Sequence, residues 1–272
     1  MNKTDDSLAD FFLGKRLYGD DFAPDEIRAW FSEEAEGYAN LGAKDADSYC
    51  YEYHALNWAH AFRHIEHNKF EKALGIGSAY GDEFKPIAHQ VEHITVLDPS
   101  SAFDRVRDID GTPCNYVRPN ELGYMSFSDE EFDLISCLGV LHHIPNVSTV
   151  LSECFRCLRP GGVMVVREPI SSMGDWRKAR PGLTRRERGI PVALFDDIVD
   201  SCGFEVQRKK LCTFPLFTKL ARIPGFRSPY NSRVVVALDE LVCNVIPWRL
   251  VYFRSTVVER LAPGAVHYIL RK

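Results

Sequence analysis

Long hydrophobic runs are absent from this chain of 272 residues. A membrane-spanning helix needs about 20 consecutive apolar residues, and no segment of the sequence has that character. The N-terminus carries Asp5, Asp6 and Asp10 around Leu8 and Phe11, instead of the basic and then apolar segment of a secretory signal peptide. We therefore expect a cytoplasmic protein.

An excess of basic residues is also lacking. The chain has 33 Lys and Arg against 38 Asp and Glu, which gives a formal net charge of −5. Proteins that bind nucleic acid normally present a strongly basic surface to the phosphates. The composition therefore predicts no nucleic-acid partner.

Paired metal-ligand motifs are scarce as well. The eight cysteines are scattered, which favours buried reduced thiols over a disulfide framework. Cys154 and Cys157 form a C-x-x-C inside an expected helix over 150–158, without the second pair that a zinc site needs. His60 and His64 are four residues apart with no carboxylate motif, so we expect them on a solvated helix face. The sequence predicts no metal site.

A glycine turn between apolar segments is the most informative pattern that is present. Residues 73–81 read ALGIGSAYG, and residues 96–100 read VLDPS. A strand that enters a glycine turn lets the backbone approach a ligand, and a carboxylate at the end of the next strand can accept hydrogen bonds from ribose hydroxyls. Asp98 follows the turn by about 20 residues, as in the dinucleotide-binding fingerprint. The pattern predicts a nucleoside cofactor.

Short apolar segments alternate with helical stretches after residue 72, which is typical of a parallel sheet covered by helices on both faces. Because ligands of such sheets bind beyond the carboxyl ends of the strands, we expect Gly77, Asp98, His143 and Glu168 at one edge. The expected strands are 73–76, 94–97, 116–117, 134–137, 163–166, 205–206 and 266–270.

Two further segments complete a pattern in a fixed order: residues 132–143 read FDLISCLGVLHH, and residues 158–168 read LRPGGVMVVRE. Together with the glycine turn and Asp98, they resemble the class I S-adenosylmethionine-dependent methyltransferases over roughly residues 70–210. Segments 17–22, 138–147 and 182–191 are also similar to members associated with surface-polysaccharide biosynthesis. Dehydrogenases, the other nucleotide-binding alternative, fit the two segments poorly.

This resemblance implies a Rossmann-like, seven-stranded, mostly parallel sheet with helices on both faces, and S-adenosyl-L-methionine as the cofactor. The glycine turn would shape the pocket for the methionine end, Asp98 would bind the ribose, and Glu121 would be preferred over Asn120 near the adenine amino group. The implied cofactor-binding residues are Gly75, Gly77, Ser78, Ala79, Gly81, Asp98, Pro99, Ser100, Asn120, Glu121 and Leu138.

The turn departs from the family pattern at two positions. The family usually has an acidic residue where this chain has Gly75, and a glycine where it has Ala79. Gly77 and Gly81 remain, so the turn itself is expected to form. The departures leave open a non-catalytic cofactor-binding module that serves protein association.

Methyl transfer from a sulfonium to a hydroxyl needs alignment of the two groups and removal of a proton. An imidazole with a pKa near neutrality suits the second task, and His143, with His142 as its rival, is the candidate base. Lining of the cofactor pocket is the alternative role of His143. Glu168 is expected to position an acceptor hydroxyl or ammonium, or else to form an ion pair with Arg167 or another arginine.

Acceptor recognition is expected from two segments. The aromatic and polar stretch 49–58 either lies over the ligand cleft or packs as a cap helix, and the loop 173–191 is strongly basic in an acidic protein. Arginine forks suit phosphate or carboxylate groups, so we expect a sugar, glycan or other small anionic acceptor; a solvated loop is the alternative. The candidate substrate-binding residues are Tyr53, His54, Trp176, Arg177, Arg185, Arg186 and Arg188.

The chain is expected to form a single methyltransferase domain over 1–272. A helical cap covers 1–68, the cofactor-binding core covers 69–210, an insertion or lid covers 211–262, and the last strand lies in 263–272. The insertion mixes aromatic and basic residues, a combination that can contact nucleic acid, sugar phosphates or a lipid headgroup layer, the last as peripheral contact with the inner face of a membrane. A helical lid or a dimer contact is the alternative. The leading function is O-methylation of an anionic sugar or glycan; a methyltransferase of secondary or quinone metabolism is the enzymatic alternative.

Overall fold

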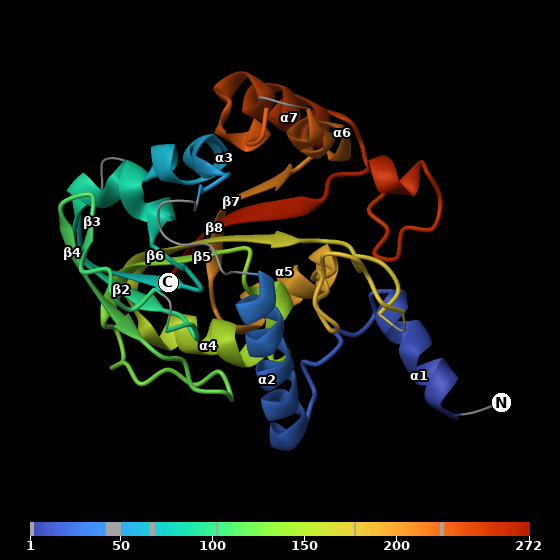
Figure 1. Ribbon diagram of the computed structural model, residues 1–272, viewed down its shortest axis with the longest axis horizontal. Coiled ribbons are helices and arrows are strands. Elements are labelled where there is room, and N and C mark those ends of the chain that lie inside the picture. Colours follow the sequence, from blue (N-terminus) through green and yellow to red (C-terminus); the bar gives the residue numbers. More distant parts are fainter. Residues whose placement is uncertain (1–2, 42–49, 66–68, 102, 177, 224–225) are drawn as a thin grey trace.

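The computed structural model describes residues 3–41, 50–65, 69–101, 103–176, 178–223 and 226–272. Eight strands form one sheet (Figure 1). Their bounds are β1 (Phe70–Ile76), β2 (Val91–Leu97), β3 (Asp108–Ile109), β4 (Thr112–Val117), β5 (Phe132–Leu138), β6 (Leu158–Pro169), β7 (Glu205–Cys212) and β8 (Ala265–Arg271). The spatial order is β3-β4-β2-β1-β5-β6-β8-β7.

The centre of the sheet is parallel and both edges are antiparallel. Strand β1 pairs in parallel with β2 and β5, and these pair in parallel with β4 and β6. Strand β8 runs antiparallel between β6 and β7. The predicted Rossmann-like class is confirmed, but the predicted number of seven strands is one too few. Strand β3 was not predicted because it has only two residues. It precedes β4 and pairs antiparallel with it through the turn Asp110-Gly111, whose positive φ angles of 51° and 88° suit a tight hairpin.

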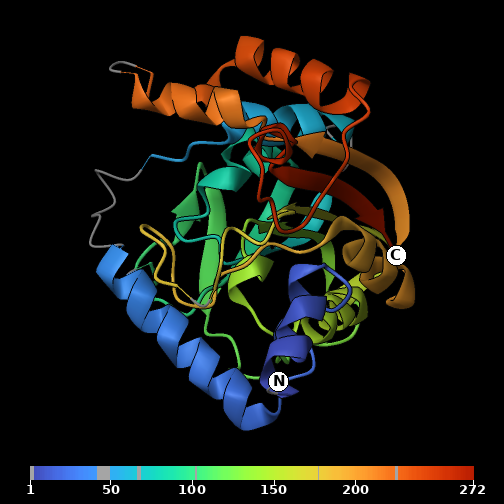
Figure 2. The ribbon, with the colours of Figure 1, turned by 90° about the vertical axis from the view of Figure 1, so that its right-hand side faces the viewer.

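Helices cover both faces of the sheet (Figures 1 and 2). Helices α4 and α5 lie on one side, and α3 and α7 lie on the other. The helices are α1 (Lys3–Phe12), α2 (Pro24–Leu41), α3 (His54–His60), α4 (Val147–Cys157), α5 (Val192–Ser201), α6 (Pro215–Thr218) and α7 (Arg233–Val245). Short 3-10 helices are η1 (Phe62–His64), η2 (Asp82–Gln90), η3 (Leu141–His143), η4 (Lys219–Arg222), η5 (Pro229–Asn231) and η6 (Glu259–Leu261). None of the helices in the described ranges is both long and apolar enough to cross a bilayer.

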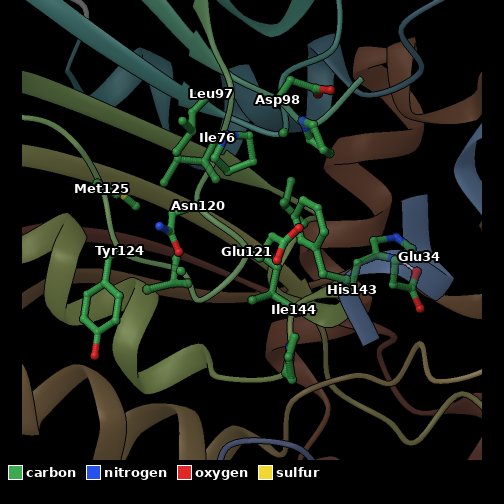
Figure 3. Close-up of a pocket in the computed structure, with 18 of the residues that line it drawn as sticks. Glu34, Ile76, Leu97, Asp98, Asn120, Glu121, Tyr124, Met125, His143 and Ile144 are labelled. Carbon is green, nitrogen blue, oxygen red and sulfur yellow. Dashed lines mark hydrogen bonds and ion pairs between the residues drawn. The ribbon is translucent and has the colours of Figure 1, made fainter. Parts of the chain in front are cut away.

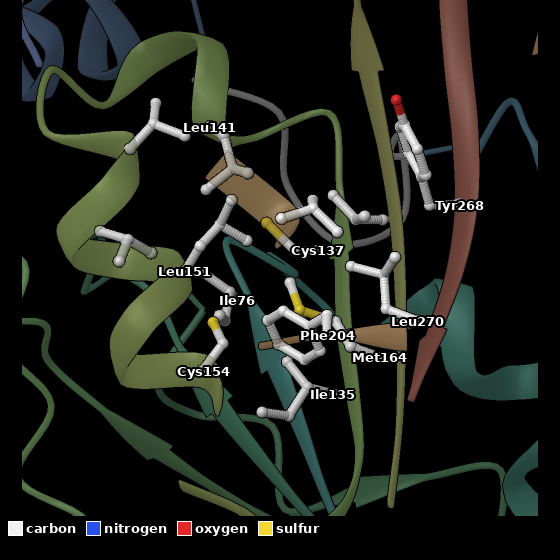
Figure 4. Close-up of a cluster of buried hydrophobic side chains, with 14 of the residues drawn as sticks. Ile76, Ile135, Cys137, Leu141, Leu151, Cys154, Met164, Phe204, Tyr268 and Leu270 are labelled. Atoms are coloured by element: carbon white, nitrogen blue, oxygen red, sulfur yellow. The ribbon is translucent and has the colours of Figure 1, made fainter. Parts of the chain in front are cut away.

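Apolar side chains fill the space on each face of the sheet. On one face, side chains of β1, β5, β6 and β8 pack against α4 and α5, with Cys137, Cys154 and Met164 among them (Figure 4). The prediction of buried, unpaired thiols at Cys154 and Cys157 is confirmed, because both are free and fully buried. On the other face, Phe62, Phe84 and Ile87 pack against the same strands.

The expectation of a solvated face for His60 and His64 is half wrong. His64 is exposed, but His60 is buried, and its ring lies 5.9 Å from that of His267. Burial lowers the pKa of His60 to about 3, so the imidazole is neutral and acts as a core side chain. The chain folds this way because α3 packs its inner side against the sheet, which the short helical pattern did not reveal.

The carboxyl ends of the parallel strands meet at one edge of the sheet. Ile76 of β1 is in register with Leu97 of β2 and Cys137 of β5, and Leu138 is in register with Arg167 of β6. The loops after these strands therefore emerge side by side. The segment between β7 and β8, which holds α6, η4, η5, α7 and η6, occupies the position of the predicted insertion.

Candidate functional site

The turn after β1 has a backbone that only small residues allow. Gly77 and Gly81 have φ angles of 62° and 74°, and a Cβ atom on Gly77 would lie 2.6 Å from a methyl group of Val140. Ala79 has a φ of 49°, so it adopts the left-handed conformation of the glycine that the family has there. The Tyr116 hydroxyl holds the turn by donating to the Ala79 carbonyl at 2.6 Å. The Ala79 departure therefore keeps the backbone of the turn.

Gly75 leaves no room for the acidic residue of the family. A Cβ atom at this position would lie 2.2 Å from Ser78 Oγ and 2.6 Å from Phe84 Cε2. A different carboxylate is nearby: Glu83, in η2, is 4% exposed and lines the same cavity as Ser78 and Ala79. Burial raises the pKa of Glu83 to about 7, and the negative charges of Asp82 and Asp98 act in the same direction. Glu83 was not among the predicted site residues, although it follows Gly81 by only two residues.

Asp98 is fixed at the end of β2, as predicted from its position. Its two carboxylate oxygens accept hydrogen bonds from the backbone N–H groups of Ala79 at 3.1 Å and Ser100 at 2.9 Å. It is 5% exposed, and burial raises the pKa of its carboxyl group. A rigid carboxylate beside the glycine turn can accept further hydrogen bonds from a ligand, because each oxygen has a second lone pair.

The smaller of two adjoining cavities, about 140 Å³, lies beside Asp98 (Figure 3). Its lining is mostly apolar, with Ile76, Leu97, Pro99 and Met125, while Glu34 and Phe31 of α2 close one side. Both adenine-site candidates line it. Asn120 also accepts a hydrogen bond from the Leu122 N–H at 2.8 Å, and Glu121 lies 3.9 Å from Arg28.

The larger cavity, about 520 Å³, adjoins the smaller one, since Ile76, Gly77 and Gly139 line both. Its lining is rich in polar groups, in contrast to the smaller cavity. Among the predicted residues it is lined by Gly77, Ser78, Ala79, Leu138, His142, Glu168 and Tyr53. Gly75, Gly81 and Ser100 line neither cavity, and they shape the turn or hold Asp98 instead.

Glu168 holds His142 and the η3 turn. It is fully buried, and its carboxylate accepts the backbone N–H groups of Val140 and Leu141 at 2.8 Å each and of His142 at 3.3 Å. The His142 Nδ1 atom lies 2.8 Å from the same carboxylate. An ion pair of Glu168 with Arg167, one of the predicted alternatives, is not among the contacts of the described residues, and four hydrogen bonds from residues 140–142 occupy the Glu168 carboxylate. The remaining ring nitrogen of His142, Nε2, is 3.6 Å from Glu187.

His143 is held by α2 and has the opposite protonation tendency. Its Nδ1 lies 2.9 Å from Glu34 Oε2, and Glu34 Oε1 accepts a hydrogen bond from the Thr184 hydroxyl at 2.6 Å. Burial lowers the pKa of His143, but the Glu34 hydrogen bond and the surrounding carboxylates outweigh it, so that the pKa is raised. For His142, burial and the neighbouring His143 prevail over Glu168, and the pKa is lowered. His142 is thus the neutral imidazole of the pair.

The two histidines face different spaces: His142 lines the larger cavity, and His143 lines the smaller one. Together with Glu187 they bring three potential metal-ligand atoms within 4.8 Å of one another. Each imidazole already has a carboxylate partner, so the described contacts form a hydrogen-bonded network around η3.

Arg167 is the cation of the larger cavity, and it was not among the predicted binding residues. Its guanidinium lies 4.0 Å from the centre of the Tyr53 ring and donates to Asn57 Oδ1 at 2.8 Å. Asn57 in turn donates to the Tyr51 hydroxyl at 2.7 Å. His54 does not line the cavity; its backbone N–H donates a hydrogen bond to Asn231 Oδ1. Its position near the carboxyl end of β6, the edge at which ligands of such sheets bind, could have identified Arg167 from the sequence.

The arginines of the loop 173–191 have structural contacts. Arg188 is fully buried and donates to the carbonyl groups of Tyr18, Leu141, His142, Ile144 and Pro145. Arg186 pairs with Glu33 at 2.9 Å, and Arg185 is exposed. Trp176 stacks on Phe12 and Tyr18 and donates to the Ser172 carbonyl. None of these four residues lines either cavity, and Arg177 lies outside the described residues.

The known proteins that resemble this chain are named as methyltransferases. Residues 74–166 match the family model described as "Methyltransferase domain". A Mycolicibacterium smegmatis protein named "Probable S-adenosylmethionine-dependent methyltransferase" is 28% identical over 134 residues, which cover 49% of this chain and 51% of that protein. The ubiquinone biosynthesis O-methyltransferase of Pseudomonas fluorescens is 28% identical over 96 residues, 34% of this chain and 41% of the enzyme. The chain thus spans about half the length, or less, of these curated relatives.

Among solved structures, the 1,6-didemethyltoxoflavin-N1-methyltransferase of Burkholderia thailandensis aligns with a TM-score of 0.55 and 15% identity, over 92% of this chain and 91% of that chain. This is the fold of S-adenosylmethionine-dependent methyltransferases. In this chain the turn after β1 and the end of β2 lie together, because Gly77 and Asp98 line the same cavity. Gly77 lines both cavities without a side chain, which fits the close approach of a cofactor to the backbone.

Proposed function

We propose that this protein is an S-adenosylmethionine-dependent methyltransferase that methylates a hydroxyl group of a small polar acceptor. The observation that carries the proposal is the junction of two cavities at Gly77 and Gly139. One cavity has an apolar lining with Asp98 at its edge, which suits an adenosine group. The other is polar and contains a neutral imidazole, that of His142, which suits an acceptor that must lose a proton.

The residues present fit the cofactor from end to end. Asp98 would accept hydrogen bonds from the ribose hydroxyls, and Asn120 or Glu121 would accept from the adenine amino group. Glu83 would pair with the ammonium group at the methionine end, in place of the acidic residue that Gly75 excludes. When bound, the sulfonium of the cofactor supplies an electrophilic methyl group.

His142 is the base that the geometry favours, which reverses the preference of the sequence for His143. Its Nδ1 is oriented by Glu168, and its Nε2 can accept the hydroxyl proton as the bond to the methyl group forms. Glu168 then stabilises the imidazolium, since the carboxylate is fixed by three backbone N–H groups. His143 has a raised pKa and belongs to the adenosine-side cavity, so it would bind the cofactor side and leave proton removal to its neighbour.

Arg167 supports an acceptor that carries negative charge, such as an acidic sugar or glycan. Arg167 lines the larger cavity, as do Thr213 and Thr218, and its guanidinium lies 4.0 Å from the centre of the Tyr53 ring. These groups can donate hydrogen bonds or stack on a sugar ring. The role that the sequence assigned to Arg185, Arg186 and Arg188 passes to Arg167 in this proposal.

A methyltransferase of quinone metabolism is the second candidate. The similarity to ubiquinone biosynthesis O-methyltransferases favours it, whereas the polar lining of the larger cavity and Arg167 favour a charged, hydrophilic acceptor. A non-catalytic cofactor-binding module would use the same Asp98 site but would transfer no methyl group.

Calorimetric titration with S-adenosylmethionine and S-adenosylhomocysteine tests the cofactor site. Loss of the Asp98 carboxylate in Asp98→Ala removes hydrogen bonds worth about 1.5–3 kcal/mol each, so binding should weaken at least tenfold. Asp98→Asn, which keeps one acceptor oxygen, should show a smaller loss, and Asp104→Ala, at an exposed carboxylate nearby, should bind like wild type. Failure of the folded wild-type protein to bind either compound would refute the proposal.

Transfer of a labelled methyl group then separates the candidates. Wild-type protein is offered acidic sugars, their neutral counterparts and a catechol as a quinone-type acceptor. We expect transfer to acidic sugars, reduced about 100-fold or more in His142→Ala with cofactor binding retained. Transfer to the catechol alone would favour quinone metabolism, and cofactor binding without transfer to any acceptor would favour the non-catalytic module.

A further inference from the structure

Exposed apolar side chains are concentrated in the segment between β7 and β8. The described part of the chain has 14 large apolar side chains that are exposed, and 11 of them lie within residues 211–262. Helix α7 of this segment packs on β7 and lies at the outside of the molecule (Figures 1 and 2). This surface is therefore apolar well beyond what scattered exposure would produce.

Helix α7 has two apolar faces. At about 100° per residue, its four exposed apolar residues fall within an arc of about 60°, roughly opposite the residues that it buries. The exposed residues and their exposed fractions are Val234 (70%), Leu238 (46%), Leu241 (57%) and Val245 (69%). The buried residues are Val235, Val236, Asp239 and Cys243. Packing on the sheet thus explains one face of α7 and leaves the other unexplained.

The same segment is basic within an acidic protein. Residues 211–262 contain seven Lys or Arg and three Asp or Glu, a net charge of +4, which leaves −9 for the rest of a chain whose total is −5. One of the three acidic groups, Asp239, is buried. The exposed basic residues are Lys219, Arg222, Arg227, Arg233, Arg249 and Arg260. Exposed apolar and cationic side chains are therefore concentrated in the same segment of the chain.

We propose that this surface binds peripherally to an anionic lipid bilayer, with the exposed face of α7 in the headgroup layer. A helix with an apolar stripe and flanking basic residues lies in the plane of such an interface, where the stripe is buried and each cation is attracted to the lipid charge. We call the stripe Val234, Leu238, Leu241 and Val245, with Ile246 and Leu250 after it, the α7 face.

Charge decides between a bilayer and a second copy of the chain. In a two-fold symmetric dimer the same surface meets itself, so two copies of this segment, each with a net charge of +4 and with Arg233 at the start of α7, would be brought together. Like charges at a contact are unfavourable, whereas an anionic membrane complements them. The net charge of +4 on this segment thus favours an anionic lipid surface over a second copy.

Residues of the segment that contains the α7 face also line the larger cavity. Thr213 and Thr218 line that cavity, and Leu216 between them is 50% exposed. Helix α6 therefore connects the cavity with the basic, apolar surface. Membrane binding would hold the cavity near the headgroups, although the binding itself does not depend on the proposed methyl transfer.

Vesicle flotation of the full chain tests the proposal. Phosphatidylcholine vesicles are compared with vesicles in which about one third of the lipid is phosphatidylglycerol. We expect binding to the anionic vesicles only, and weaker binding at high salt because exposed charges are screened. Arg222→Gln with Arg233→Gln should lower the partition coefficient by about fivefold per charge removed.

Two matched double variants isolate the apolar contribution. Leu238→Asp with Leu241→Asp places charge on the α7 face, away from the core, so the protein should fold and lose vesicle binding at least tenfold. Leu13→Asp with Val206→Asp makes the same kind of change at exposed apolar positions elsewhere and should bind like wild type. Circular dichroism checks folding, and S-adenosylmethionine titration checks the cofactor site independently.

Two results would overturn the inference. If the wild-type protein does not bind anionic vesicles, it has no membrane-binding surface at α7. The second result is a wild-type protein that is a dimer by light scattering and does not bind vesicles. If Leu238→Asp with Leu241→Asp converted that dimer to a monomer, the α7 face would contact a second copy.

Discussion

Glu83→Gln should make the ligand-free protein more stable and its cofactor site weaker. Glu83 is 4% exposed, and burial raises its pKa from 4.5 to about 7. A glutamine has nearly the same shape but never ionises. The substitution therefore removes the cost of a buried negative charge together with the charge that would pair with the cofactor ammonium.

The magnitude follows from proton linkage. Below pH 4.5 the carboxyl group is protonated in the folded and unfolded chains, so its pKa causes no change in stability. Between pH 4.5 and about 7 the unfolded chain releases this proton while the folded chain keeps it, and the free energy of unfolding falls by about 1.4 kcal/mol per pH unit. Above pH 7 the full loss, about 3 kcal/mol, is present and does not increase further.

Thermal unfolding of wild type and Glu83→Gln across pH 5.5–8 measures this directly. The stability advantage of the variant should grow by about 2 kcal/mol over that range, which corresponds to roughly 4–8 °C in melting temperature. S-adenosylmethionine should bind wild type more tightly as the pH rises from 5.5 to 7, because only the ionised carboxylate pairs with the ammonium. The variant should bind at least tenfold more weakly at pH 7.5, without that rise.

Glu92→Gln, at an exposed carboxylate at the start of β2, is the matched control and should change neither quantity. A Glu83→Gln protein whose stability advantage does not vary with pH would show that Glu83 is not held protonated by burial. Unchanged cofactor affinity would show that Glu83 does not contact the methionine end.

Three further predictions concern the loops around the site. Arg188→Ala should lower the free energy of unfolding, measured in urea, by at least about 3 kcal/mol, because several buried carbonyl groups lose their donor. Arg185→Ala, at an exposed side chain, should change it by less than about 0.5 kcal/mol. Equal effects of the two substitutions would refute the structural role of Arg188. Ala79→Gly should keep cofactor binding, whereas Ala79→Val should weaken it and destabilise the chain by about 2 kcal/mol or more, since a β-branched residue resists a φ of 49°. His142→Ala should reduce transfer about 100-fold or more with little change in cofactor affinity, and His143→Ala should weaken S-adenosylmethionine binding instead; the reverse pattern in calorimetry and transfer assays would restore His143 as the base.

The sequence by itself determined the sheet and the edge at which the site lies. Apolar strands, the glycine turn and Asp98 are local patterns, and the parallel connections bring the carboxyl ends of neighbouring strands together. For this reason Gly77, Asp98 and Leu138 could be predicted at the cavities. The burial of Cys154 and Cys157 also follows from local sequence.

Only the tertiary structure decided which polar groups face a cavity and in which protonation state. His142 and His143 are neighbours in sequence, yet one is held by Glu168 and the other by Glu34, which is 109 residues away. Glu83 gains importance because Ser78 and Phe84 fill the space at Gly75.

The loop arginines show the same limit of local sequence. A basic loop indicates an anion site when it is read alone, but Arg188 turns inward to bond the carbonyl groups of η3 and of Tyr18, 170 residues before it. Such long-range contacts are set by the packing of distant segments, and packing determines burial, hydrogen-bond partners and therefore pKa. Local pattern placed the site on the sheet, and tertiary contacts assigned its chemistry.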